Sequence, residues 1–515
     1  MHSFKVNSIS RKRFIGSLLS FISVPFIPKT WGSPQEGYFK HGVASGDPLQ
    51  DRVIIWTRVS PPNTSEAVVV WEVATDSNFR KLVKKGKFST SEARDFTVKI
   101  DVTGLEAGKL YYYRFSYKNE YSRVGMTRTL PKELKGGAFH IAVVSCSDWE
   151  SGYFSAYRHI ARKEEVDLVL HLGDYIYEYE TGRRDNGLSD RTFLPRHEIV
   201  TLDDYRQRYA QYRTDPDLQL LHATKPFCLV WDDHEIANDA FQMGAQNHQS
   251  ETEGPWEDRR NAAIQAYFEW LPVRGNKPSD LIRKLSVGEE LELFLLDQRL
   301  TGRTAQLSVN DVDFYQEERS LLGREQFEWL EDNLKDSQAK WKLIANQVPF
   351  AGYKPNKDGL PNYRDKWLGY PHDHQRLLRL LKENRSGNTV FLTGDHHRAF
   401  VMAVHDEPNP MQYTKPWAYK PLAWELLTPS ITARNDDFRT KVEIQAREAA
   451  ILDTEVNPHV MFCDIKSHGY YVARIEANAF KATYFFMEDI RNPRSEERRI
   501  ASFEMNGKDF MLRRT

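Results

Sequence analysis

Between residues 138 and 400 the sequence alternates short apolar segments with longer amphipathic ones, and this alternation limits the possible fold more than any other feature. The apolar segments, such as residues 140–146 and 167–172, place apolar side chains at consecutive positions. The amphipathic segments repeat apolar side chains with helical spacing. They cover residues 153–165, 258–271, 324–336 and 372–385, and a charged helical run follows at residues 440–452. A strand that is apolar on both faces needs cover on both, which predicts an α/β fold with a buried sheet between helices.

The N-terminal part of the chain has a different pattern. Over residues 38–130, short segments alternate apolar and polar side chains and are separated by turn residues, which predicts a small all-β sandwich. We therefore expect a β-sandwich domain over residues 38–130, a linker, a large α/β domain over residues 138–490 and a C-terminal tail over residues 491–515. Residues 181–204 show no periodicity and predict a long loop near a site.

The first 32 residues predict an export signal. Lys5, Arg11, Lys12 and Arg13 precede an apolar run over residues 14–27, the layout of a signal peptide. This run is shorter than the roughly 20 apolar residues that span a membrane. We therefore expect export to the periplasm, cell surface or medium, without a transmembrane span. The segment resembles a twin-arginine signal with Lys12 in place of the second arginine, and a general secretory signal or an uncleaved anchor are the alternatives.

Charge and cysteine content exclude several classes of protein. The 71 Lys and Arg residues balance 72 Asp and Glu residues, so no overall field attracts nucleic acid or an anionic membrane, and we expect no nucleic-acid partner. Three cysteines in 515 residues do not form a disulfide framework. Cys228 and Cys463 either pair with each other or remain buried thiols.

Polar residues that can bind metal ions directly follow five of the apolar segments. They are Cys146-Ser147-Asp148, Gly173-Asp174, Asp232-Asp233-His234-Glu235, Asn346-Gln347 and Asp395-His396-His397. The carboxyl ends of the strands in an open α/β sheet face one crevice, so these groups are expected to converge. One such turn is ordinary capping of a strand end, but five together predict a metal site.

Two residues indicate which kind of metal ion the site would bind. Tyr177 lies three residues after Asp174, and a phenolate is a hard anionic ligand that suits a trivalent ion. Cys146 would add a thiolate, which loses its proton when it binds a metal. Taken singly, each has an ordinary alternative: Tyr177 as an aromatic packed under a loop, and Cys146 as a buried thiol.

These residues carry a family resemblance. The ordered motifs are similar to those of calcineurin-like metallophosphoesterases, and longer segments make the chain resemble the alkaline phosphatase D family from about residue 38 to residue 486. The segments are residues 39–48, 52–58, 145–146, 173–177, 231–235, 394–397 and 457–459. The resemblance implies a fibronectin-like sandwich, a four-layer αββα metallophosphatase domain, and a site with ferric iron and calcium.

The same resemblance implies roles for individual residues. Cys146, Asp174, Tyr177 and His397 would bind Fe³⁺, and Asp174 would bridge to a Ca²⁺. The implied calcium ligands are Asp174, Asp233, Asn238 and Asp395. His396 is expected to be a bystander or a group behind the ligands, and Asp148 either a calcium ligand or such a group.

The implied function is that of a secreted phosphatase, which hydrolyses phosphomonoesters, phosphodiesters or both by attack of a metal-bound hydroxide. His234, beside Asp233, would stabilise the developing charge or protonate the leaving oxygen. The alternatives are a diester-specific phosphodiesterase of the phospholipase D type and, in another class, a non-catalytic cell-surface binding protein. We expect a phosphate ester substrate and a monomer.

Overall fold

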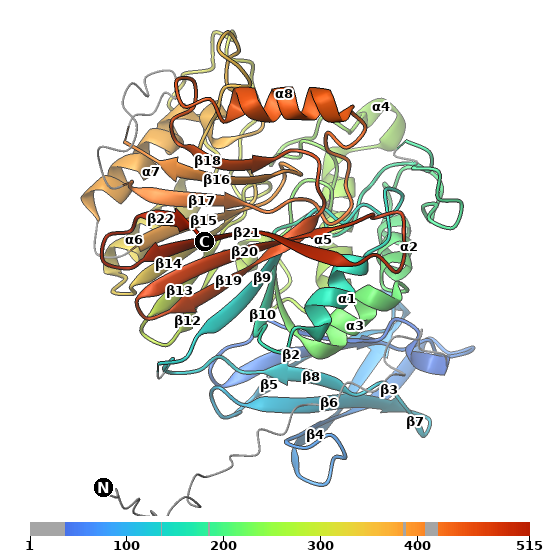
Figure 1. Ribbon diagram of the computed structural model, residues 1–515. Coiled ribbons are helices and arrows are strands. Elements are labelled where there is room, and N and C mark those ends of the chain that lie inside the picture. The colour runs from blue at the N-terminus through green and yellow to red at the C-terminus, as the bar shows by residue number, and fades with distance from the viewer. Residues whose placement is uncertain (1–36, 135, 184–185, 385–387, 407–420) are drawn as a thin grey trace, which may run out of the picture.

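The computed structural model describes residues 37–134, 136–183, 186–384, 388–406 and 421–515 (Figure 1). The predicted export signal therefore lies outside the described residues. The residues that the structure describes form three sheets, of ten, seven and five strands. No helix of the described part is long and apolar enough to cross a membrane.

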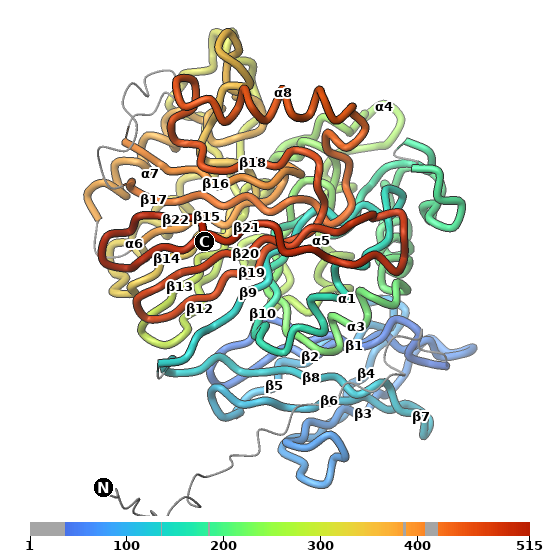
Figure 2. The backbone as a smooth tube through the Cα atoms, viewed as in Figure 1, coloured from blue at the N-terminus to red at the C-terminus, as the bar shows by residue number. Residues whose placement is uncertain are grey.

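The ten-stranded sheet has the order β22-β21-β20-β19-β9-β10-β11-β1-β2-β5. Its strands come from the start, the middle and the end of the sequence. They are β1 (Val43–Gly46), β2 (Arg52–Arg58), β5 (Thr97–Thr103), β9 (Phe139–Val144), β10 (Leu168–His171), β11 (Pro226–Leu229), β19 (Gly469–Glu476), β20 (Ala479–Met487), β21 (Glu497–Asn506) and β22 (Leu512–Arg514). In Figures 1 and 2 the red strands β20 and β21 run beside β19, which neighbours the teal β9.

The seven-stranded sheet has the order β12-β13-β14-β15-β17-β16-β18. Its strands are β12 (Arg283–Val287), β13 (Leu291–Leu295), β14 (Trp341–Asn346), β15 (Asn388–Thr393), β16 (Ala399–Val404), β17 (Ala423–Leu427) and β18 (Val460–Asp464). The five-stranded sheet is formed by β3 (Glu66–Ala74), β4 (Leu82–Ser91), β6 (Leu110–Tyr117), β7 (Glu120–Tyr121) and β8 (Gly125–Arg128).

The apolar cores explain why so many strands are apolar on both faces. In β9, Ile141 and Val143 point into a core between the ten- and seven-stranded sheets, while Ala142 and Val144 face helices on the other side. In β14, Leu343 faces the core between the sheets and the next residue faces a third core, under another group of helices. Successive side chains of a strand point to opposite faces, so each strand serves two cores.

Helices cover the outer faces of both large sheets. The helices over the ten-stranded sheet are α1 (Ser155–Arg162), α2 (Leu202–Tyr212), α3 (Pro216–Thr224) and α5 (Trp256–Trp270), and those over the seven-stranded sheet are α6 (Arg324–Asp336), α7 (Pro371–Glu383) and α8 (Lys441–Ile451). A single-turn helix, α4 (Ser250–Glu253), lies in a connection. The α/β prediction is confirmed, and α6 has the predicted bounds.

The structure differs from the expected domain organisation in two respects. Strands β1, β2 and β5 of the expected sandwich continue the ten-stranded sheet, because β1 pairs in parallel with β11. Residues 491–515, expected to be a tail, form β21 and β22 at the far edge of that sheet. The sequence of β21 looks polar because one face of this strand is exposed.

The cysteine alternatives are resolved in favour of free thiols. Cys228 lies in β11 and Cys463 in β18, strands of two different sheets. Both are buried and free, as is Cys146.

Candidate metal centre and active site

Three of the predicted ligands meet where strands end. Cys146 follows β9, Asp174 follows β10 and His397 follows β15. The Cys146 thiol, a carboxylate oxygen of Asp174 and a ring nitrogen of His397 all lie within 4.8 Å of one another. Residues up to 251 positions apart in the sequence therefore form one cluster, as expected from the position of strand ends in an α/β fold.

The backbone is unusual at these residues. Cys146, Asp174, Asp395 and His397 all have positive φ angles, between 55° and 61°, a conformation that is uncommon for residues other than glycine. Such angles cost on the order of 1–3 kcal/mol each and cluster at functional sites. The residue before Asp174, Gly173, has φ +100°, and a Cβ there would lie 2.3 Å from the backbone nitrogen of Asp232. Only glycine allows these two strand ends to approach so closely.

Tyr177 belongs to the same cluster. Its hydroxyl donates to Asp174 Oδ2 at 3.0 Å and lies 3.3 Å from His397 Nε2. Thiol, carboxylate, phenol and imidazole groups are thus gathered around one point.

His397 is oriented as a metal ligand would be. Its Nδ1 lies 2.7 Å from the backbone carbonyl oxygen of Arg434, and a carbonyl can only accept, so Nδ1 carries the proton. The lone pair of Nε2 then points toward Asp174 and Tyr177. A second hydrogen bond that fixes the tautomer in this way is typical of histidines that bind metal. The donor set therefore fits a transition-metal ion.

A second group of carboxylates lies beside the first. One oxygen each from Asp232, Asp233 and Asp395 lie within 4.8 Å of one another, and Asp233 forms a similar group with Asp239 and Asp365. Burial, followed by the neighbouring carboxylates Asp365 and Asp233, raises the pKa of Asp395 to about 8. A cation between these oxygens would remove that repulsion, and oxygen-only donors suit a hard ion such as Ca²⁺.

Arg299, which the sequence interpretation missed, holds these carboxylates together. Its fully buried guanidinium pairs with Asp232 and, at 2.7 Å, with Asp365. It also lies 3.5 Å from Asp395. Burial raises the pKa of Asp233, but the charges of Arg299 and His234 outweigh burial and lower it. Arg299 follows β13 in the sequence Asp-Gln-Arg, which has no metal-binding residue spacing that would have revealed it.

Asn238 was expected to bind calcium, but its backbone and side chain are hydrogen-bonded to other residues of the protein. Its backbone N–H donates to Glu178 Oε1 at 2.8 Å, and its side-chain oxygen accepts from the Tyr179 hydroxyl at 3.2 Å. Its amide nitrogen donates to Gln246. Its role as a calcium ligand stays a prediction.

The predicted catalytic residue, His234, is held by Glu178, which the sequence interpretation also missed. Glu178 Oε2 lies 2.7 Å from His234 Nδ1, so Nε2 is the ring atom left to reach a substrate. The ring packs against that of Tyr177, with centroids 4.2 Å apart and the ring planes tilted by 31°. Burial alone lowers the pKa of His234, but the Glu178 carboxylate reverses this and raises it well above its usual value. Glu178 directly follows Tyr177, and this adjacency was the only available signal.

The remaining polar strand ends have other partners. Asn346 was expected near the metal, but its amide nitrogen donates to the Val348 carbonyl and its oxygen accepts from the Trp367 indole. It therefore fixes the loop after β14. The ring of His396 contacts the Tyr353 hydroxyl at 2.9 Å and Lys366 Nζ at 3.1 Å.

Comparisons with known proteins agree with this site. The model of the PhoD-like phosphatase family matches residues 141–484, and the model of its N-terminal domain matches residues 28–131. The chain is 35% identical over 495 residues to alkaline phosphatase D of Bacillus subtilis (strain 168), covering 90% of this chain and 80% of that protein.

A solved structure is similar to this chain over almost its whole length. The structure described as that of PhoD superimposes with a TM-score of 0.82 at 34% sequence identity, and covers 94% of this chain and 93% of its own. The sequence matches, the similar fold and the cluster of candidate metal ligands thus all support the same family assignment. The chain belongs to the PhoD-like phosphatase family.

Proposed function

We propose that this chain is an exported, metal-dependent phosphoric ester hydrolase that acts on phosphomonoesters, phosphodiesters or both. The observation that carries the proposal is the cluster of Cys146, Asp174, Tyr177 and His397 with His234 held beside it. Family membership supports the same reaction.

The proposed metal ions are Fe³⁺ and Ca²⁺. Cys146, Asp174, Tyr177 and His397 would hold the iron, and Asp174, Asp233, Asn238 and Asp395 the calcium. When bound, such ions activate water and neutralise charge on the phosphoryl oxygens. Asp174 is suited to bridge them, because its oxygens lie near both Tyr177 and the cluster that contains Asp233.

The protein's own contribution to the reaction centres on His234 and Glu178. Glu178 fixes the ring by accepting from Nδ1, so Nε2 carries the second proton of the imidazolium. From there His234 would stabilise charge on the phosphoryl group or donate a proton to the leaving oxygen, an effect of roughly 10² to 10⁴ in rate. Tyr177 supports the ring by packing against it at a tilt.

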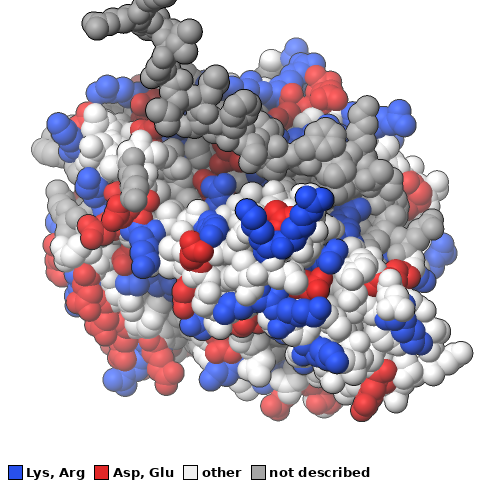
Figure 3. Space-filling view, turned by 90° about the horizontal axis from the view of Figure 1, so that it is seen from below, with Lys and Arg blue, Asp and Glu red and all other residues white. Residues whose placement is uncertain are grey.

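A non-catalytic binding protein is the alternative of another class. The five-stranded sheet would provide its surface, and the face seen from below in Figure 3 carries Lys and Arg side chains among Asp and Glu. Exposed Lys85 and Lys87 lie on β4, which is an edge strand, and lysines on edge strands also prevent pairing with other sheets. A binding surface alone gives no reason for four ligand residues with strained backbone angles, which favours the enzyme.

Three finer features belong to the proposal. The three cores support a four-layer αββα arrangement of the catalytic part, preceded by a fibronectin-like sandwich over residues 38–130. The basic and apolar N-terminal segment supports export. We also propose a monomer.

The test is hydrolysis of chromogenic phosphate esters by the purified, metal-loaded protein. We expect turnover of 4-nitrophenyl phosphate or of its diester, with iron and calcium found by elemental analysis. Asp174→Asn should abolish activity and reduce the content of both metals, because the bridging carboxylate is lost, whereas Asp332→Asn, at an exposed position on α6, should change neither. An inactive native protein would overturn the proposed function, and equal metal content in Asp174→Asn would overturn the bridging role.

A further inference from the structure

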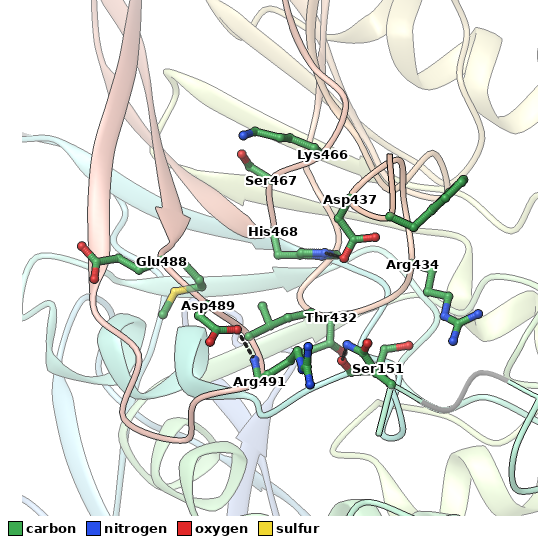
Figure 4. A pocket seen from close by; sticks show the side chains of 14 residues that line it. Ser151, Thr432, Arg434, Asp437, Lys466, Ser467, His468, Glu488, Asp489 and Arg491 are labelled. Carbon is green, nitrogen blue, oxygen red and sulfur yellow. Dashed lines mark hydrogen bonds and ion pairs between the residues drawn. The ribbon is translucent and has the colours of Figure 1, made fainter. Parts of the chain in front are cut away.

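A cavity of about 580 Å³ lies beside the metal centre (Figure 4). Most of its lining comes from three connections, namely the segment after β17, the turn before β19 and the segment after β20, and Ser151 and Asn186 add to it. Strand β19 neighbours β9, and Tyr471 pairs with Val143. Strand β20 follows β19, and Phe486 pairs with Gly469. The cavity therefore lies at the same edge of the ten-stranded sheet as the end of β9, which Cys146 follows.

Direct contacts join the cavity wall to the metal ligands. Thr432 lines the cavity, and its backbone N–H donates to the Cys146 carbonyl at 3.3 Å. Arg434 also lines the cavity, and its carbonyl is the group that orients His397. Backbone groups of two residues that line the cavity are therefore hydrogen-bonded to two of the proposed metal ligands.

The cavity lining carries three basic and three acidic side chains. The basic side chains of Arg434, Lys466 and Arg491 line it together with Asp437, Glu488 and Asp489. The acidic groups are engaged by the protein, since Asp437 lies 3.4 Å from the His468 ring, Glu488 pairs with Arg498 and Asp489 accepts from a backbone N–H. Within the described part of the chain, no carboxylate lies within ion-pair distance of Lys466 or Arg491.

Hydroxyl and amide groups complete the lining. Figure 4 shows Lys466 and Ser467 on one side of His468 and Asp437, and Arg491, Ser151 and Thr432 on the other. Asn186 contributes a further amide to the lining. Cations combined with hydroxyl and amide donors are the groups that recognise a phosphate.

We propose that this cavity, the Lys466–Arg491 pocket, binds a second phosphate group of the substrate while the first is cleaved at the metal centre. This rests on the proposed phosphatase function and specifies its substrate class. Esters that carry a second phosphate group near the cleaved one are the preferred substrates. Lys466 and Arg491 bind the second phosphate and so favour substrates that carry one, whereas cleavage takes place at the metal centre.

The test compares two substrates that differ only in the second phosphate. Thymidine 5′-(4-nitrophenyl phosphate) and its 3′-phosphorylated derivative both release 4-nitrophenolate, so initial rates report cleavage at the same bond. For the native holoenzyme we expect kcat/KM to be about tenfold higher with the 3′-phosphate, mainly through KM. Because the cations are exposed, the preference should shrink at high salt.

Matched variants assign the preference to the pocket. In Lys466→Gln/Arg491→Gln the ratio of the two kcat/KM values should fall to near one. The control Lys340→Gln/Arg80→Gln removes two exposed cations elsewhere and should keep the native ratio. Equal kcat/KM values in the native enzyme, or a native ratio in the pocket variant, would overturn the inference.

The outcomes separate this inference from the proposed function. An enzyme that cleaves 4-nitrophenyl phosphate but neither thymidine ester would overturn the inference and leave the phosphatase function standing. An enzyme that cleaves none of the three would overturn both.

Discussion

At the scale of single residues, the contact between Glu178 and His234 would prepare a buried imidazole for the proposed proton transfer. The carboxylate fixes the ring at 2.7 Å and also accepts from the backbone of Asn238 and the side chain of Asn247. In the proposed mechanism Glu178 is thus a positioning residue, which would act through His234.

We expect Glu178→Gln to lower kcat by about 100-fold with little change in KM or in iron and calcium content, because the ring loses its charged partner while the metal ligands stay. Steady-state kinetics and elemental analysis measure this. Glu180→Gln is the control, since Glu180 is 45% exposed and lies 3.8 Å from Arg183. Loss of metal from Glu178→Gln would show that Glu178 supports the ligands instead.

Tyr177 and Cys146 allow an optical test of the proposed iron site. Phenolate and thiolate ligands transfer charge to ferric iron by absorbing visible light, so the holoprotein should be coloured. Tyr177→Phe should shift or remove much of the visible band, and Cys146→Ser should perturb it and weaken iron retention. Absorption spectra and iron content measure both effects. A fully active, colourless protein without iron would contradict these ligand roles.

At the scale of secondary-structure elements, the C-terminal strands matter more than their sequence suggested. Phe503 of β21 is 1% exposed and packs in the core between the two large sheets. Ile500 of the same strand is 43% exposed. The alternation within β21 therefore attaches the last strands to the core on one face only.

We expect Phe503→Ala to lower the free energy of unfolding by about 3–5 kcal/mol, because it leaves a cavity between the sheets. Ile500→Ala should change it by no more than about 0.5 kcal/mol. Urea unfolding of both variants measures the difference. Similar losses in the two variants would show that β21 does not contribute to the core as described.

At the scale of the whole molecule, the N-terminal strands and the α/β part share one sheet. The Trp56 indole donates to the Glu269 carbonyl at 2.8 Å, and Trp56 packs in the core that contains α5. Buried Asp47 pairs with Arg283 at 2.6 Å. Each part therefore completes the other's buried contacts.

A fragment of residues 138–515 should consequently fail to fold as a soluble monomer. It would expose the edge of β11 and leave Arg283 without Asp47, a loss of about 3–5 kcal/mol for a broken buried pair. Far-UV circular dichroism and sedimentation, compared with residues 33–515, test this. A monomeric fragment that unfolds cooperatively like the longer chain would contradict it.

The sequence by itself determined the local features. Consecutive apolar residues and helical spacing predicted the α/β class and the bounds of α6, because these patterns reflect which faces of an element are buried. The motifs around Asp174, Asp233 and His397 predicted a metal site, since ligand types at strand ends are visible in a linear sequence.

Only the tertiary structure decided which distant groups meet. Asn346 looked like a site residue because it follows an apolar strand, yet its partners are Val348 and Trp367. Glu178 and Arg299 looked ordinary, yet they contact His234 and the carboxylate group. Nor does local pattern specify that β1 pairs with β11. Such contacts depend on how whole sheets pack, and side-chain spacing along one segment carries no information about the partner segment.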